Sequence, residues 1–252
     1  KSKFSKIRPM SAHKLDDNYH KIKYPALVQR KLDGFRCLSN VLNNGSVLLH
    51  SKTMKEFTNL NHIRDEISKI KLLVGGIFYL DGELYEKNLK LHEISSIVMK
   101  KMFNENEKQI SYYIFDIFNI NNLTETFENR YNILKNIFKT HSFKYLKLVE
   151  CTEVSTLNEI YNLDLKYLYD GYEGVIVRNK NGVYKLNSKS YDVLRTKEFK
   201  KKEFKIIGAK EGTGTQKGAV IWQLECLNNI SHCYLLKKDY QKIMDYTFQV
   251  II

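Results

Sequence analysis

A lysine with chemically useful neighbours stands near the start of the chain, in the run VQRKLDGFRC. Lys31 precedes an Asp-Gly pair by two residues, and Arg36 follows the same pair. A lysine in water has a pKa near ~10.4, so at neutral pH its ammonium group has no lone pair with which to attack. Burial or nearby cations, a metal ion included, favour the neutral amine. Lys31 is therefore a candidate nucleophile, although a motif this short also occurs on ordinary protein surfaces.

Motifs with matching chemistry follow in order along the chain. LDGELY places Glu83 on an expected strand after an Asp-Gly turn, YYIFDIF places Phe115 directly before an aspartate, DGYEGVIVR places Glu173 on another strand, and LRTKEF supplies Arg195 and Lys197. Carboxylates bind divalent cations, basic side chains bind phosphates, and aromatic rings stack on bases. Taken singly, these residues have simpler explanations as solvated strand acids, a core aromatic and a basic surface. Together with a candidate nucleophile, and in this order along the chain, they favour a functional site over these simpler explanations.

The motif series KxDGxR, DGE, an aromatic before Asp, EGxVxR and a basic-x-Lys pair resembles the nucleotidyltransferase domain of the ATP-dependent polynucleotide ligases. The resemblance covers roughly residues 28–208. The later run EFKIIGAKEGTGTQKGAVIW is similar to the start of the ligase OB domain, which favours a DNA ligase. The resemblance therefore implies an enzyme that seals nicks in DNA during replication or repair. An RNA ligase, an mRNA-capping guanylyltransferase and a nucleic-acid-binding module that has lost the chemistry remain as alternatives.

The resemblance also implies a role for each motif residue. Lys31 attacks the α-phosphate of ATP and becomes a lysyl-AMP, and the AMP then passes to the 5′-phosphate of a nick. Glu83 and Glu173 hold Mg²⁺, or Glu83 instead binds the ribose, and Phe115 stacks on the adenine. The full set of expected nucleotide-binding residues is Gln29, Arg30, Lys31, Arg36, Lys52, Glu83, Phe115, Arg195 and Lys197.

The sequence departs from the family pattern in three respects. Lys52, in HSKTMKEF, stands where ligases usually carry an arginine, so a point charge replaces a bidentate guanidinium group. Arg195 stands where lysine is usual, which keeps the charge. After Trp222 we find no basic motif like the one that closes the ligase OB domain. We therefore expect the second domain to be short or incomplete.

Short β-rich runs mixed with helical stretches up to about residue 192 predict an α+β fold. Asn-Asn-Gly and Asp-Gly between these runs favour antiparallel hairpins over repeated βαβ crossovers. The predicted strands are residues 26–32, 35–42, 46–51, 78–85, 111–118 and 173–179, and the predicted helices are 59–70 and 128–138. We expect a nucleotidyltransferase domain over residues 1–196, ATP-grasp-like with mainly antiparallel sheets, and a small or incomplete β-barrel OB domain over residues 197–252.

The composition narrows the setting in which the protein works. Lys and Arg number 41 against 28 Asp and Glu in 252 residues, a formal charge of +13. This charge suits a partner rich in phosphates, such as nicked duplex DNA, but heavy lysine use also follows from a biased base composition. The four cysteines form no CxxC pair, which disfavours a zinc site and favours a reducing compartment. No apolar run reaches the ~20 residues of a membrane span. We expect a monomer inside the cell, in the cytoplasm, the nucleus or a viral factory, and neither a membrane protein nor a secreted one.

Overall fold

The computed structural model describes residues 7–42, 44–74, 78–100, 105–196, 205–211, 213, 217, 219–225 and 231–238. By its internal contacts the chain divides into two compact units, Lys1–Glu198 and Phe199–Ile252. The first unit holds every expected site residue, although Lys197 lies outside the described residues. The identity of residues 1–196 and 197–252 as nucleotidyltransferase and OB domains stays a prediction.

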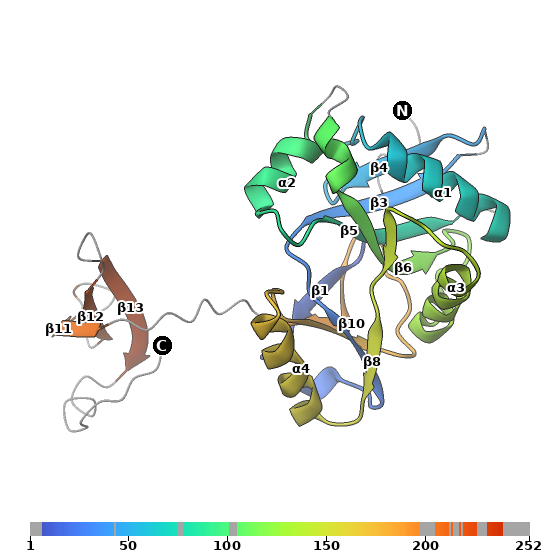
Figure 1. The fold of residues 1–252 in the computed structure, drawn as a ribbon. Helices are drawn as coiled ribbons and strands as arrows, with labels where there is room; N and C mark the ends of the chain where they lie inside the picture. Colours follow the sequence, from blue (N-terminus) through green and yellow to red (C-terminus); the bar gives the residue numbers. More distant parts are fainter. Residues whose placement is uncertain are drawn as a thin grey trace. The chain divides into compact units, whose positions relative to one another are not determined.

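The first unit contains a five-stranded sheet, which we call sheet A. In spatial order its strands are β1 (Ser11–Lys14), β10 (Lys189–Arg195), β9 (Val175–Asn179), β2 (Ala26–Arg30) and β8 (Cys151–Val154). β1 runs parallel to β10, and the other neighbours are antiparallel. Helix α4 (Leu157–Tyr169) packs on this sheet, where its Ile160 joins Val28 and Val175 in a common core (Figure 1). Removal of these side chains from water stabilises the sheet.

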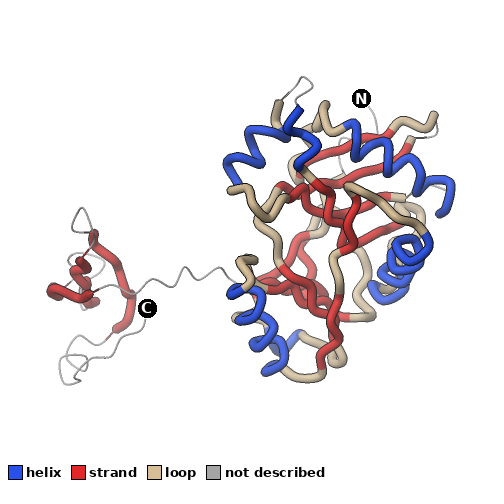
Figure 2. The backbone as a smooth tube through the Cα atoms, viewed as in Figure 1, coloured by secondary structure: helices blue, strands red, loops and turns tan. Residues whose placement is uncertain are grey.

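A second five-stranded sheet, sheet B, lies beside the first. In spatial order its strands are β4 (Val47–Ser51), β3 (Phe35–Val41), β5 (Tyr79–Tyr85), β6 (Ser111–Phe118) and β7 (Leu146–Leu148). Its neighbours are antiparallel except for β6 and β7, which are parallel. The helices that pack against it are α1 (Asn61–Val74), α2 (Leu91–Val98) and α3 (Phe127–Thr140), and two short 3₁₀ helices, η2 (Tyr19–Lys21) and η3 (Glu105–Gln109), lie in connections (Figure 2).

Helix α3 shows how the sequence fixes this packing. Thr126 caps its first turn, because the threonine hydroxyl accepts a hydrogen bond from the Asn129 amide at 3.3 Å. Phe127, Tyr131 and Leu134 follow the i, i+4, i+7 spacing that places side chains on one helix face, and all three are buried. Within the described residues, no helix is long and apolar enough to cross a lipid bilayer.

The fold class predicted from the sequence is confirmed, whereas two local expectations are wrong. All predicted strands and helices are present, with ends that differ by a few residues. β3 and β4 pair antiparallel across the Asn-Asn-Gly stretch, as expected. Asp33–Gly34 does not make a hairpin, because β2 belongs to sheet A and β3 to sheet B. Asp81–Gly82 is no turn either, since it lies inside β5 at a register shift against β6. The Asp-Gly pair after Lys31 therefore carries the chain from one sheet to the other.

Buried side chains from both sheets meet in a small core of their own. Leu38 and Phe118 from sheet B pack there with Met10 and with Val193 of β10. Tyr184 lies among them and stacks on Phe118, with ring centroids 3.9 Å apart. Because close-packed side chains resist displacement, this core fixes the position of one sheet against the other.

The described strands of the second unit form a three-stranded antiparallel sheet. Its order is β11 (Lys205–Glu211), β12 (Ala219–Glu225) and β13 (Ser231–Lys238). The β-rich character expected after residue 197 is therefore present in these strands. The closing run YTFQVII lies outside the described residues.

Candidate active site

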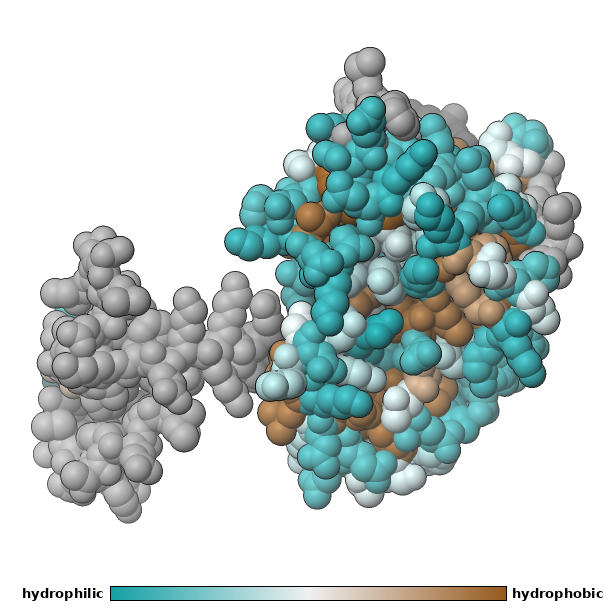
Figure 3. Space-filling model, viewed as in Figure 1, coloured by the Kyte–Doolittle hydropathy of each residue, from teal (hydrophilic) through white to brown (hydrophobic). Residues whose placement is uncertain are grey.

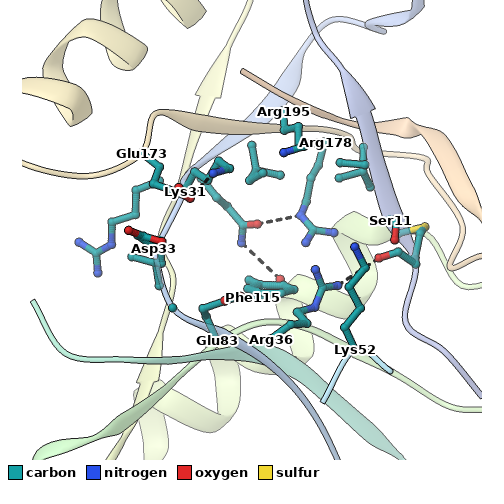
Figure 4. Close-up of a pocket in the computed structure, with 18 of the residues that line it drawn as sticks. Ser11, Lys31, Asp33, Arg36, Lys52, Glu83, Phe115, Glu173, Arg178 and Arg195 are labelled. Carbon is teal, nitrogen blue, oxygen red and sulfur yellow. Dashed lines mark hydrogen bonds and ion pairs between the residues drawn. The ribbon is translucent and has the colours of Figure 1, made fainter. Parts of the chain in front are cut away.

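A cavity of about 410 Å³ is lined by residues of both sheets of the first unit (Figure 4). The expected site residues that line it are Gln29, Arg30, Lys31, Arg36, Lys52, Glu83, Phe115, Glu173 and Arg195. Lys197 lies outside the described residues, so its place relative to the cavity stays a prediction. Motif residues that are far apart in the sequence are thus brought to one site.

The candidate nucleophile sits where the backbones of β2 and β9 continue past their last regular pair. The Lys31 amide donates to the Gly174 carbonyl at 2.8 Å, and the Glu173 amide donates to the Lys31 carbonyl at 3.0 Å. The Lys31 ammonium group in turn donates to the Glu173 carboxylate. Gly174 has a φ of +116°, and a Cβ there would overlap the Thr196 hydroxyl, so glycine is required. The fold therefore holds an amine beside a carboxylate at the cavity wall.

The crossover after Lys31 presses against the strand that carries Glu83. A Cβ on Gly34 would overlap the Leu84 carbonyl and lie 2.9 Å from the Glu83 Cγ, so only glycine permits this approach. Burial raises the pKa of Glu83 to about 8, and the Asp81 and Glu173 carboxylates act in the same direction against the opposing Arg36 cation. A pair of carboxylates that destabilise each other's charge favours a cation between them.

Glu83 and Glu173 fit the requirements of a magnesium ion. Mg²⁺ is commonly held by one or two carboxylates, with substrate phosphates and water completing the octahedron. No cluster of three or more His, Cys, Asp and Glu side chains suited to a metal occurs in the part of the chain that the structure describes. A magnesium ion at these two residues would therefore take its remaining ligands from a phosphate and from water.

Arg36 is held by the buried carboxylate of Asp81, a residue that the sequence analysis did not single out. Its Nε and one Nη each donate to the Asp81 carboxylate at 2.6 Å, and the same Nη donates to the Met10 carbonyl at 3.2 Å. Tyr184 donates its hydroxyl hydrogen to the same carboxylate. Burial disfavours the charged guanidinium, but the adjacent Asp81 carboxylate outweighs it and raises the pKa of Arg36. Arg36 is thus a fixed cation whose geometry is set by its partner.

A second buried network positions Gln29. Arg178 donates from Nε to the Gln29 side-chain oxygen at 2.7 Å and from Nη1 to Asp116 at 3.0 Å. Arg130 donates from its Nε to the other oxygen of Asp116 at 2.8 Å. The Gln29 amide nitrogen donates to the Phe115 carbonyl at 3.3 Å. These contacts orient the Gln29 amide, with its oxygen toward Arg178.

Phe115 lies between the two networks. Its ring centroid is 4.5 Å from the guanidinium carbon of Arg36 and 5.2 Å from that of Arg178. Guanidinium groups at this distance are attracted to the aromatic quadrupole. The cavity therefore contains an aromatic ring held between two fixed cations.

Sequence reasoning missed several residues of this site. Arg178 closes the EGVIVR run, and Asp116 follows Phe115 directly, so both stood inside quoted motifs and were passed over. Asp81 opens the DGE motif in the same way. Ser11 and Lys189 also line the cavity but belong to no motif, so no local signal in the sequence could have found them.

Three cations at the cavity have no counter-ion among the described residues. The side chains of Lys52, Lys189 and Arg195 are exposed, and they form no ion pair, hydrogen bond or ring contact with the rest of the described chain. The visible face of the first unit is mostly hydrophilic (Figure 3). The cavity is thus open to solvent at positions that carry unpaired positive charge.

A model of the ATP-dependent DNA ligase domain matches residues 9–197 of this chain. The chain belongs to the ATP-dependent DNA ligase family. A DNA ligase of African swine fever virus (isolate Warthog/Namibia/Wart80/1980) is 32% identical over 207 residues, which cover 80% of this chain and 49% of the relative. The DNA ligase of Enterobacteria phage T4 is 24% identical over 252 residues, covering 81% of this chain and 51% of the relative. The chain spans about half the length of these ligases.

Solved ligases share the fold of this chain. The Chlorella virus DNA ligase–adenylate has a TM-score of 0.61 at 22% identity, covering 89% of this chain and 83% of that one. The ATP-dependent DNA ligase of bacteriophage T7, solved in complex with ATP, has a TM-score of 0.63 at 18% identity, covering 90% and 80%. At these identities the likeness establishes a common fold with other ligases, and the chemistry must be argued from the residues.

Proposed function

We propose that the chain is an ATP-dependent DNA ligase that seals nicks in duplex DNA through a lysyl-AMP intermediate. The observation that carries the proposal is the Lys31 amine, held beside the Glu173 carboxylate in a cavity that also contains Glu83, Phe115 and unpaired cations. Family membership supports it. The proposal concerns the activity of a whole ligase. This chain spans about half the length of its curated relatives.

In the first step, the neutral Lys31 amine attacks the α-phosphorus of ATP. The Lys31 ammonium group first loses a proton to solvent. A phosphorus–nitrogen bond then forms, the bond to the β-phosphate oxygen breaks, pyrophosphate leaves, and the remaining surplus amine proton is also released to solvent. The ion pair with Glu173 keeps the amine directed at the cavity before the attack. Mg²⁺, when bound by Glu83 and Glu173, supplies positive charge to the phosphate oxygens as negative charge spreads over them.

The base of the nucleotide would be held by groups that the fold has already fixed. We assign stacking on the adenine to Phe115. Its carbonyl accepts a hydrogen bond from Gln29, and its ring lies between Arg36 and Arg178. Gln29 would contact an edge of the base, because its amide is oriented by Arg178. We assign neutralisation of the α-phosphate to Arg195, together with Lys197. Groups that need not reorganise on binding stabilise a transition state most effectively.

Two further transfers complete the reaction. The AMP passes from Lys31 to the 5′-phosphate at the nick, which restores the lysine. The 3′-hydroxyl of the other strand end then attacks that phosphate, AMP leaves, and the backbone is closed. The same cations and the same metal ligands would stabilise the phosphate in all steps. The expected setting is a monomer that acts on nicked duplex DNA inside the cell.

Labelling with α-³²P nucleotides tests the first step. The protein is incubated with labelled ATP or GTP and Mg²⁺ and then separated by denaturing electrophoresis. We expect a covalently labelled band with ATP, weak or no label with GTP, and no band for Lys31→Ala. Absence of label from the wild-type protein would contradict the proposal, and preferential labelling by GTP would indicate a capping guanylyltransferase instead.

Sealing assays test the substrate. Matched duplexes that carry one nick in an all-DNA or an all-RNA strand are compared under the same conditions. We expect faster closure of the DNA nick. Faster closure of the RNA nick would indicate an RNA ligase.

A further inference from the structure

Three neighbouring strands of sheet A begin or end at the candidate nucleophile. β2 ends one residue before Lys31, β9 begins two residues after Glu173, and β10 ends at Arg195. The side chains of all three residues line the cavity (Figure 4). The regular pairing of the strands stops at this edge of the sheet. Contacts made beyond the regular pairing therefore fix the three side chains relative to one another.

Thr196, the residue after β10, makes such contacts. The register of β9 and β10 places it opposite Val175, and its amide donates to the Val175 carbonyl at 3.1 Å. In a regular antiparallel pair the Val175 amide would donate back to a backbone carbonyl. Here it donates to the Thr196 hydroxyl oxygen at 2.9 Å. Because Thr196 is only 5% exposed, water does not readily replace this acceptor.

Asp164 of helix α4 is a second partner of the same hydroxyl. The Thr196 Oγ1 lies 2.9 Å from the Asp164 Oδ1 and 3.3 Å from the Val175 carbonyl oxygen. A hydroxyl has one hydrogen to donate, and a carboxylate is the stronger acceptor of the two. The hydroxyl therefore donates to Asp164 while its oxygen accepts from the Val175 amide. Helix α4 is thereby tied to the edge of the sheet where β9 begins and β10 ends.

Gly174 packs against this pair of side chains. A Cβ at this position would overlap the Thr196 hydroxyl and would lie 2.6 Å from the Asp164 Oδ1. The Gly174 carbonyl in turn accepts from the Lys31 amide at 2.8 Å. The Asp164–Thr196 hydrogen bond thus lies against the residue that follows Glu173 and binds the backbone of the nucleophile.

We propose that Asp164 is a positioning residue for the formation of lysyl-AMP, and that it acts through Glu173. Its hydrogen bond with Thr196 fixes the backbone that follows Glu173, and this backbone sets where the carboxylate stands beside the Lys31 amine. The inference rests on the proposed function, in which Glu173 directs the amine and binds the metal. Neither Asp164 nor Thr196 lines the cavity, so neither touches the nucleotide in this role. A misplacement of about 1 Å in a reacting group can slow a reaction about 10²-fold.

The backbone of Arg195 depends less on this hydrogen bond, although Arg195 directly precedes Thr196. Arg195 is paired with Ile176 of β9 on one side and with Lys14 of β1 on the other. The stretch before β9 is paired with Lys31 on one side and relies on Thr196 on the other. Loss of the hydroxyl should therefore disturb the stretch that carries Glu173 more than it disturbs Arg195.

Single-turnover labelling with α-³²P ATP at saturating Mg²⁺ tests the proposal. Thr196→Val keeps the shape of the side chain without the hydroxyl and should lower the maximal rate of lysyl-AMP formation about 10–30-fold. Asp164→Ala leaves the hydroxyl in place and should lower the maximal rate about 5–10-fold. Thr196→Ser restores the hydroxyl and should stay within about twofold of the wild type. The ATP concentration at half-maximal rate should change by less than about twofold in all three variants.

A double-mutant cycle tests the route through Glu173. Glu173→Gln removes the carboxylate that Asp164 would place, so Asp164→Ala in this background should slow the reaction by less than about twofold more. A further loss as large as in the wild-type background would mean that Asp164 acts elsewhere, and the inference would be wrong. A higher half-saturating ATP concentration at an unchanged maximal rate would assign the pair to nucleotide binding and would also overturn it.

Two substitutions on the same helix serve as controls. Asn162→Ala changes an exposed residue of α4 and should alter neither the rate nor the stability. Ile160→Val removes one buried methylene group where α4 packs on sheet A, so it should lower the unfolding midpoint without slowing the folded protein. Equal slowing by Ile160→Val and Asp164→Ala would mean that only the stability of the helix matters, and the positioning role would be rejected. Failure of the ligase function itself would appear separately, as a wild-type protein that accepts no label.

Discussion

The arginines that bind buried acids beneath the cavity and the exposed cations that line it carry the same charge in opposite circumstances. Asp81 and Asp116 are fully buried, and Asp81 is bound by one arginine and Asp116 by two. Lys52, Lys189 and Arg195 stand in solvent with no such match among the described residues. A buried charge without a partner is costly, whereas an exposed one is hydrated by water.

Under the proposed function, this difference separates residues that hold the site together from those that would bind its ligand. Removing one partner of a buried pair leaves a charge in a dry interior and should lower stability. Removing an exposed cation should leave stability almost unchanged and weaken the binding of an anion. Lys31 has features of both classes, because it forms an ion pair with Glu173 and also lines the cavity.

The largest expected effect is that of Lys31→Ala, which should abolish lysyl-AMP formation, since the proposal assigns the nucleophile to Lys31 alone. Lys31→Arg should fail equally, because a guanidinium group stays protonated and has no free lone pair. Gel labelling with α-³²P ATP measures both, and thermal unfolding checks that both variants fold. Covalent label on either variant would place the nucleophile elsewhere.

Asp116→Asn should cost about 3–5 kcal/mol of stability, because Arg130 and Arg178 would be left as buried cations without their shared carboxylate. Urea unfolding measures the change. Asp17→Asn, at an exposed position, is the control and should stay within about 0.5 kcal/mol of the wild type. A loss at Asp116 below about 1 kcal/mol would mean that water reaches the network, which would remove the contrast between the two classes.

Glu173→Gln should slow lysyl-AMP formation by about 10²–10³-fold, because one electrostatic stabiliser is lost where charge develops. If the carboxylate is a metal ligand, the Mg²⁺ concentration at half-maximal rate should also rise. Single-turnover labelling over a range of Mg²⁺ concentrations gives both numbers. A slower rate with an unchanged Mg²⁺ midpoint would restrict Glu173 to orienting Lys31.

Arg195→Ala should have the smallest effect, about 10–100-fold on lysyl-AMP formation, which corresponds to the loss of one charge-assisted hydrogen bond to phosphate. Its unfolding midpoint should match that of the wild type, since the side chain is exposed and has no partner among the described residues. A marked loss of stability would show that Arg195 has a structural partner and belongs with the buried class.

Local sequence was sufficient for the parts of the site that depend on residue type and short spacing. Alternating and continuous apolar runs predicted the strands that carry Gln29, Glu83 and Phe115, because side-chain periodicity reports which face of an element is buried. The Asp33–Gly34 pair, two residues after Lys31, identified Lys31 as the candidate nucleophile. The prediction that Asp33–Gly34 forms a hairpin turn was wrong. A glycine that permits a tight turn and one that permits a close approach to another strand look alike in sequence.

The pairing of charges was decided by the tertiary structure alone. Arg36 meets Asp81 across 45 positions of the chain, and Arg178 meets Gln29 across 149. No periodicity spans such separations, because it records burial over a few residues and says nothing of which distant partner a buried group will face. The sequence by itself indicated a candidate lysine nucleophile, two candidate acids and an aromatic ring. Only the packing of two sheets against each other decided which cations form ion pairs with buried acids and which, like Lys189, lie exposed at the cavity without a counter-ion among the described residues.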